Sequence, residues 1–303
     1  MAKCECGKAA IIEQKYSNRF LCEADFLKSF EIRVSRLIRK HIQIGRGEHV
    51  SVGVSGGKDS AAALFYMKKF SARHPFELDA ILIDEGVKGY RDNSIKAAEK
   101  LCEQLQITLH KYSFQKLFGF RLDKIKTKKG GILPCSYCGV FRRKALNTAA
   151  KELHTSKLVI GHNLDDEAQV ILMNFLRGDT ERSARLGFTS SPVYPGFIQR
   201  IKPLRTSPER ETLAYALINN LPIYNGECPY AQTAFRNDVR NLLNQMEEKY
   251  PGTKYALLNS FDRLLPALKS TFTPQMLNKC PTCGEPTSGT TCKACEYLAS
   301  FKN

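Results

Sequence analysis

The chain has 303 residues, of which 43% are hydrophobic and 25% charged, and this composition excludes a disordered or fibrous protein. No run of about 18 apolar residues occurs, and the first residues, MAKCECGKAA, lack the apolar stretch of a secretory signal, so we expect a cytoplasmic protein that does not enter a membrane. In the cytoplasm, the 11 cysteines are expected to be thiolates for metals or chemistry rather than disulfides.

The net charge of +16 is concentrated in short basic segments. These are residues 124–129, 141–144, 200–205 and 235–240. A polyanionic partner would explain them, because neutralising phosphates releases counterions. The alternative is a solvated basic face that serves only solubility.

The order of the predicted elements indicates an α/β fold. Residues 26–44 have helical spacing with a basic outer face, and buried strands are predicted at 49–54, 78–84 and 157–162, each followed by a helical segment. Such alternation predicts a parallel sheet with helices on both faces. A further helix at 253–268 leads into a cysteine-rich tail. We therefore expect a small N-terminal module at 1–26, a central domain at 27–250 and a C-terminal helix with its tail at 251–303.

The strongest motif, SGGKDS, directly follows the first predicted strand and precedes an alanine-rich helix. Gly56 and Gly57 would let backbone N–H groups approach a ligand, while the helix N-terminus and Lys58 add positive charge. The motif predicts a phosphate cradle made by Ser55, Gly56, Gly57, Lys58, Asp59 and Ser60. Its spacing differs from GxxxxGK[ST], so kinase-type transfer of the γ-phosphate is not indicated. A glycine-rich turn before a capped helix is the purely structural alternative.

SGGKDS after a strand resembles the PP-loop of ATP pyrophosphatases, which cleave ATP to AMP and pyrophosphate and adenylate a substrate oxygen. The resemblance implies an adenine nucleotide α hydrolase-like fold that binds ATP and Mg²⁺. It also implies that Ile83 and Asp84, at the end of the second predicted strand, lie near the ribose or adenine. An aspartate at a strand end can equally serve only to cap the following segment.

The third predicted strand runs into GHNLDDEA at residues 161–168. Asn163 as an N-cap, with three acids complementing the helix dipole, would alone explain this segment. The functional alternative places the acids at the carboxyl end of a parallel strand, where open α/β sheets bind ligands. GHNLDDEA also resembles a motif of the same family. That resemblance implies a nucleotide site that includes Gly161, Asp165 and Asp166, with Asp166 coordinating Mg²⁺ or steering proton transfer.

Three cysteines remain in the central region besides Cys102. Cys135 and Cys138 are predicted in a loop flanked by glycine and proline, and Cys228 in a loop after the strand-like residues 221–225. Cys102, on an amphipathic helix, is expected to be a buried apolar residue. Three thiolates leave one metal position vacant, as in catalytic sites. Zinc with water, a redox dithiol and buried thiols are all open from the residues alone.

The whole pattern is similar to that of the cytosolic tRNA 2-thiolation enzymes, and CSYCGVFRR resembles the branch acting on wobble uridine 34. The resemblance implies that Cys135, Cys138 and Cys228 hold a [4Fe–4S] cluster with one iron free to bind sulfide. ATP would adenylate the C2 oxygen of a tRNA uridine, and sulfide would displace AMP. Arg142 would neutralise charge on the adenylate or the tRNA, unless it is simply a surface arginine.

The expected partners are tRNA, a sulfur donor that is either free sulfide or a ubiquitin-like thiocarboxylate protein, and a second copy of the chain in a homodimer. Three other functions stay open: thiolation of uridine 54, another PP-loop reaction such as lysidine synthesis, and non-catalytic RNA binding by a zinc protein. The lysidine alternative does not need the three cysteines, and the non-catalytic one does not need SGGKDS.

Cysteines at both ends of the chain predict two Zn²⁺ sites. Cys280, Cys283, Cys292 and Cys295 form two CxxC knuckles suited to tetrahedral zinc that folds the tail. Replacing Cys283 should then unfold the tail and leave the cluster intact. The N-terminal set is weaker and departs from the family pattern: Cys4 and Cys6 are separated by one residue, and Asp25 stands where a histidine is expected beside Cys22.

Overall fold

The computed structural model describes residues 2–125, 133–189, 196–230, 235–272 and 277–302, so most of the basic segment 124–129 lies outside the described residues. The strands are β1 (Ile12–Gln14), β2 (Arg19–Leu21), β3 (His49–Val54), β4 (Glu77–Asp84), β5 (Leu109–Ser113), β6 (Lys157–Ile160), β7 (Gln199–Ile201), β8 (Asn278–Lys279) and β9 (Pro286–Thr287). The α-helices are α1 (Glu23–His41), α2 (Lys58–Ser71), α3 (Tyr90–Leu105), α4 (Phe114–Phe118), α5 (Pro134–Glu152), α6 (Leu164–Leu176), α7 (Thr180–Ala184), α8 (Glu209–Ile218), α9 (Phe235–Lys249), α10 (Thr253–Thr271) and α11 (Lys293–Lys302).

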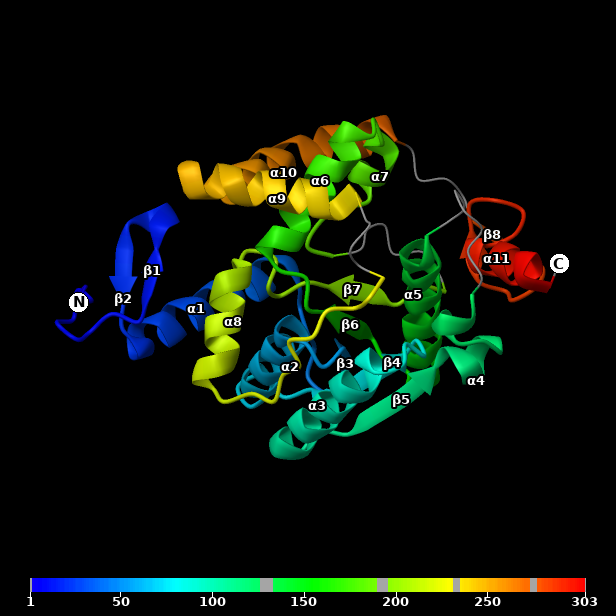
Figure 1. Ribbon diagram of the computed structural model, residues 1–303, viewed down its shortest axis with the longest axis horizontal. Coiled ribbons are helices and arrows are strands. Elements are labelled where there is room, and N and C mark those ends of the chain that lie inside the picture. Colours follow the sequence, from blue (N-terminus) through cyan, green and yellow to red (C-terminus); the bar gives the residue numbers. More distant parts are fainter. Residues whose placement is uncertain (1, 126–132, 190–195, 231–234, 273–276, 303) are drawn as a thin grey trace.

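A five-stranded parallel sheet forms the centre of the molecule (Figure 1). Its strand order is β5-β4-β3-β6-β7, and the three predicted strands correspond to β3, β4 and β6, which confirms the expected fold class. The chain builds outward from β3 through β4 to β5, then returns to the other side of β3 with β6. The boundary between β3 and β6 is therefore the switch point where such sheets bind ligands.

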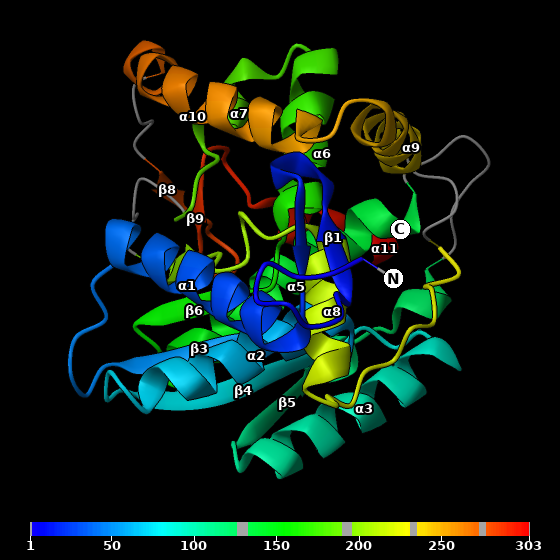
Figure 2. The same cartoon turned by 90° about the vertical axis from the view of Figure 1, so that its left-hand side faces the viewer.

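Side chains of β4 alternate between two hydrophobic layers. Ala80 and Leu82 pack in the cluster that contains α1 and α2, whereas Ile81 and Ile83 pack in the cluster that contains α5 and the cysteines of the tail. This alternation is the two-residue period of a strand that is buried on both faces. The tail is thus part of the cover over one face of the sheet, and α11 lies beside α5 in Figures 1 and 2.

A further group of helices, α6, α7, α9 and α10, lies together at one side of the sheet (Figure 2). Leu258 and Phe261 of α10 pack against Leu164 and Ile171 of α6. The predicted helix at 253–268 is therefore confirmed as α10. The expected division of the chain into three parts stays a prediction, and its first boundary falls inside α1.

Two predictions of local structure are wrong. Cys135 and Cys138 lie within the first five residues of α5 rather than in a loop, because Pro134 occupies the first helical position, where its fixed φ favours a helix start. Residues 221–225 form no strand. Instead, the backbone N–H of Tyr224 donates to the carbonyl oxygen of Gly56 at 2.8 Å, so this segment is bonded to the SGGKDS loop rather than to a sheet edge. No helix in the described part of the chain is long and apolar enough to span a membrane.

Candidate active site

The SGGKDS loop, residues 55–60, lies at the switch point and touches the segment that follows β6. Asn163 donates from Nδ2 to Oδ1 of Asp59 at 3.0 Å. A Cβ on Gly161 would lie 2.9 Å from the backbone of Asp59, so this close approach requires glycine. Gly161 was predicted to line the nucleotide site, and the structure gives it a packing reason to be glycine as well.

Hydroxyl groups and one glycine shape the SGGKDS loop. Ser60 Oγ accepts from the backbone N–H of Ser55 at 3.0 Å and donates to the carbonyl oxygen of Gly57 at 3.0 Å. Gly56 has a φ of +84°, and a Cβ there would lie 2.0 Å from the carbonyl oxygen of Ser94. These contacts fix the loop before α2, and the first backbone N–H groups of that helix have no partner within the helix, so they can bind an anion.

Lys58 is held by two carboxylates. Its Nζ lies 2.7 Å from Glu209 Oε1 and 3.2 Å from Asp59 Oδ2. Burial disfavours the cation, but Asp59 and Glu209 outweigh it and raise the pKa of Lys58. Lys58 is thus a positive charge held in position within the loop. Glu209, which lies 151 residues away in the sequence, was not predicted as a site residue, and no local pattern indicates it.

The two adjacent aspartates of GHNLDDEA have different environments. Asp165 is 6% exposed; it forms an ion pair with Lys254 and accepts from the backbone N–H of Glu209 at 2.7 Å. Asp166 forms a capping box with Asn163, as the N-cap prediction required, and its carboxylate is 25% exposed and lies 2.9 Å from Arg236. Both aspartates therefore have internal partners, but only Asp166 keeps a partly exposed carboxylate.

Ile83 and Asp84 end the neighbouring strand β4. The side chain of Ile83 is 3% exposed and belongs to the core, so a nucleotide at this position would meet mainly its backbone. Oδ1 of Asp84 accepts from the backbone N–H of Gly86 at 2.8 Å, which is the capping role considered as an alternative. Neither observation tests whether the two residues bind a nucleotide, and that role stays a prediction.

The three central cysteines lie near one another at this edge, on α5 and the loop after α8. Cys135 donates from Sγ to the carbonyl oxygen of Tyr230 at 3.0 Å, and Arg142 donates from Nη2 to Cys138 Sγ at 3.3 Å. Burial raises the pKa of both thiols, to about 11 for Cys138, and the charge of Cys228 acts on both. Cys102 is 2% exposed within α3, as expected for a core residue.

The spacing of these thiols is unlike that of a single zinc site. Zn–S bonds of about 2.3 Å place tetrahedral thiolates about 3.8 Å apart. Among the described residues, only the two terminal groups bring candidate ligand atoms within 4.8 Å of one another. The central three do not form such a group, but a four-iron cluster is wider than one ion and takes the same soft ligands. The central donor set therefore offers the soft thiol ligands that an iron–sulfur cluster takes.

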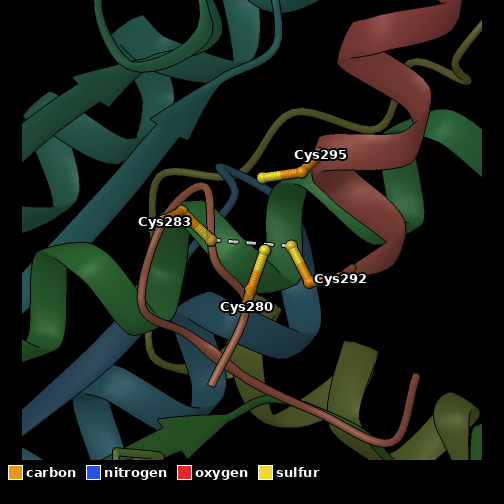
Figure 3. Close-up of side chains that lie close together, drawn as sticks. All are labelled: Cys280, Cys283, Cys292 and Cys295. Atoms are coloured by element: carbon orange, nitrogen blue, oxygen red, sulfur yellow. Dashed lines mark hydrogen bonds between the residues drawn. The ribbon is translucent and has the colours of Figure 1, made fainter. Parts of the chain in front are cut away.

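The terminal groups have the spacing that one metal ion requires. Cys280, Cys283, Cys292 and Cys295 bring their sulfur atoms within 4.8 Å of one another, and Figure 3 shows Cys283 and Cys292 pointing toward each other, 3.6 Å apart. At the other end, Cys4, Cys6, Cys22 and Asp25 form the second group. Asp25 lies 3.0 Å from Cys4 and is one of the four members of this group. Both groups could bind zinc.

Comparisons with known proteins show which family this chain belongs to. A family model described as a PP-loop domain matches residues 27–247. The tRNA 2-thiolation protein NcsA of Haloferax volcanii is 36% identical, and the alignment covers 98% of each chain. The chain belongs to the PP-loop family of tRNA 2-thiolation enzymes.

Two further members of this family extend the comparison. The tRNA-5-methyluridine(54) 2-sulfurtransferase of Pyrococcus horikoshii is 34% identical, covering 97% of this chain and 93% of that one. The structure of the U34-tRNA thiolase NcsA of Methanococcus maripaludis with its [4Fe–4S] cluster superposes with a TM-score of 0.85, at 36% identity, covering 99% of this chain and 97% of that one. The expected family and fold are confirmed, and two 2-thiolation relatives differ in the uridine they are named for.

Proposed function

We propose that this protein 2-thiolates a tRNA uridine, with wobble uridine 34 as its target, by activating the base with ATP and then replacing its oxygen with sulfur. One observation carries the proposal: the SGGKDS loop and Cys135, Cys138 and Cys228 share one edge of the sheet, in a chain that aligns over 99% of its length with a U34-tRNA thiolase. The nucleotide and the sulfur chemistry would then meet at a single uridine.

In the first step the C2 oxygen of the uridine attacks the α-phosphorus of ATP, and the bond to pyrophosphate breaks. The N–H groups of the SGGKDS loop and the start of α2 would hold the phosphates. Lys58 would neutralise charge that develops on them, since it already lies as a cation beside the loop. Asp166 is the carboxylate we assign to Mg²⁺, because it is 25% exposed, whereas Asp165 is buried and bound to Lys254 and the backbone of Glu209.

In the second step a sulfide attacks C2 of the adenylated uridine, the C2–O bond breaks, and AMP leaves with the former uridine oxygen. The reaction needs no net electron transfer. A [4Fe–4S] cluster bound by Cys135, Cys138 and Cys228 would supply an iron atom without a protein ligand at which the sulfur donor is held. Arg142, whose Nη2 lies 3.3 Å from Cys138, would offset negative charge on the adenylate.

The outer parts of the molecule take supporting roles in this proposal. Zn²⁺ would be held at both terminal groups, because each brings four ligand atoms within 4.8 Å. The surplus of basic residues would bind tRNA phosphates, so affinity should fall with salt by a slope of roughly 0.7 to 0.9 per contact. The sulfur donor is either free sulfide or a thiocarboxylate protein. A homodimer and a cytoplasmic location stay predictions.

Uridine 54 is the second candidate target, favoured by the 34% identity to the P. horikoshii enzyme. The test is to incubate anaerobically purified, iron-loaded protein with ATP, Mg²⁺, sulfide and unmodified tRNA, and then to identify thiolated fragments by mass spectrometry after nuclease digestion. We expect 2-thiouridine at position 34, with AMP and pyrophosphate released in equal amounts. Thiolation at 54 would correct the target, and ATP cleavage without any thiouridine would refute the proposed function.

A further inference from the structure

Glu85 is a buried carboxylate that two arginines from different helices share. It directly follows β4 and is 4% exposed. Its Oε2 lies 2.8 Å from Nε of Arg91 on α3, and its Oε1 lies 2.7 Å from Nε of Arg142 on α5. A buried carboxylate requires charged partners, so Glu85 ties these two helices to the carboxyl end of the sheet.

Arg91 connects Glu85 to the SGGKDS loop. It is 4% exposed, and its Nη1 donates to the carbonyl oxygen of Ser55 at 2.9 Å and to Oγ of Ser94 at 3.0 Å. Its Nη2 donates to the carbonyl oxygen of Ile83. One guanidinium therefore fixes the first residue of the loop relative to the end of β4.

Arg142 connects Glu85 to Cys138. While its Nε pairs with Glu85, its Nη2 donates to Sγ of Cys138 at 3.3 Å. The nitrogen atoms of a guanidinium lie in a fixed plane. The ion pair between Nε and Glu85 therefore determines the direction in which Nη2 of Arg142 donates. An unbroken set of contacts thus runs from Ser55 through Arg91, Glu85 and Arg142 to Cys138.

We propose that Glu85 is a positioning residue that holds the SGGKDS loop and the Cys138 side of the cysteine site in fixed relation, through Arg91 and Arg142. This inference rests on the proposed function, in which those two places bind ATP and the iron–sulfur cluster. Each of the two sites also has contacts of its own. Lys58 pairs with Asp59 and Glu209, whereas Cys135 donates to the carbonyl oxygen of Tyr230. Glu85 is the residue through which both would be disturbed at once.

The test measures two binding properties separately in purified full-length protein, without a thiolation assay. ATP affinity is measured by equilibrium binding, and iron affinity by reconstitution followed through the cluster absorbance at about 400 nm. We expect Glu85→Gln to weaken ATP binding roughly tenfold, and iron retention to fall by roughly tenfold or more, as for other residues that support metal ligands. Lys58→Ala should weaken only ATP binding, and Cys135→Ala should remove only iron.

A matched control separates positioning from general destabilisation. Glu211 is also a buried glutamate, 3% exposed, and it accepts from Gln14 and Tyr16 and pairs with Arg33. Glu211→Gln should lower thermal stability about as much as Glu85→Gln does, while both binding properties stay at the wild-type level. Circular dichroism at the assay temperature confirms that each variant is folded.

Arg142→Gln gives a second route if Glu85→Gln does not fold. It leaves the pair between Glu85 and Arg91 intact, and no adenylate forms without tRNA. ATP affinity measured in the absence of tRNA should therefore stay unchanged while iron retention falls. The inference is overturned if Glu85→Gln alters only one binding property or neither, or if Arg142→Gln weakens ATP binding as well. A wild-type protein that binds neither ATP nor iron would instead refute the proposed function.

Discussion

The ammonium group of Lys58 lies 2.7 Å from the carboxylate of Glu209, although 151 residues separate them in the chain. In the ATP complex, we expect the ammonium group of Lys58 to pair with the phosphates as well as with Glu209. We expect Lys58→Ala to weaken ATP binding by roughly 10- to 100-fold, the effect of losing a hydrogen bond to a charged group, and to leave iron content unchanged. Isothermal titration with ATP measures the change.

Lys69→Ala is the matched control for that measurement. Lys69 lies in the same helix, α2, and pairs with Glu31 rather than with any residue of the SGGKDS loop. Its removal should leave ATP affinity at the wild-type level. An equal loss in both variants would mean that Lys58 contributes only to the stability of the helix.

Gly56→Ala should disrupt the SGGKDS loop more than its backbone angle alone predicts. A left-handed φ costs an L-residue roughly 1–2 kcal/mol, and here the added Cβ would also lie 2.0 Å from the carbonyl oxygen of Ser94. Gly119 has a similar φ of +80°, with no atom within 4 Å of its Cβ position. Thermal unfolding should therefore show a clearly larger loss for Gly56→Ala than for Gly119→Ala, accompanied by loss of ATP binding only in the former.

Replacing Cys135, Cys138 or Cys228 by alanine should abolish both the absorbance at about 400 nm and thiolation. Pyrophosphate exchange with ATP and tRNA should remain, because the loop and Lys58 hold the nucleotide. Cys102→Ala is the control: Cys102 is 2% exposed in α3, and its loss should cost only some stability. An active Cys228→Ala variant, or an active protein free of iron, would contradict the assignment of the cluster.

The tail should support α5 as well as fold itself. Tyr137 stacks edge-on against Tyr297 with ring centroids 4.6 Å apart, and Lys144 donates to Cys283 at 3.1 Å. This packing changes the expectation that loss of Cys283 affects only the tail. Cys283→Ser should speed hydrogen exchange in α5 and lower iron retention by Cys138.

Cys6→Ser is the matched control for the tail, since Cys6 is likewise exposed and belongs to the N-terminal four-ligand group. Its loss should disorder the hairpin of β1 and β2 and leave exchange in α5 unchanged. Unchanged exchange in both variants would show that α5 stands without the tail.

Acid should weaken the fold through Glu167. Although burial opposes it, Lys202 and Arg205 hold the pKa of Glu167 below its ordinary value of 4.5. A lowered carboxyl pKa stabilises the folded state above the unfolded pKa, and this stability is lost as pH falls through the folded pKa. Glu167→Gln should therefore cost about 3–5 kcal/mol at neutral pH, and the difference from wild type should shrink below pH 4.5.

Denaturant unfolding at several pH values measures this effect. The control is Glu248→Gln, because Glu248 pairs with Lys15 but is 75% exposed. An exposed pair contributes little to stability, so this variant should stay close to wild type throughout. A gap for Glu167→Gln that does not change with pH would contradict the assigned ion pairs.

Several features of the protein follow from the sequence because they are local. SGGKDS lies between a strand and a helix that each form from adjacent residues, and Asn163 caps α6 with Asp166 three residues away. The CxxC knuckles of the tail also need only nearby residues, although Cys280 and Cys292 meet across a short hairpin. Alternating strands and helices were enough to predict a parallel sheet, since such connections leave few other arrangements.

The tertiary structure alone decided which distant side chains meet. Glu209 reaches Lys58, Lys254 reaches Asp165 and Glu85 joins Arg91 to Arg142 only after the helices have packed on the sheet. The edge strand β7 has three residues, too few for a periodic pattern, and forms by pairing with β6. These contacts depend on burial and on the register between elements, so no spacing within a single segment encodes them.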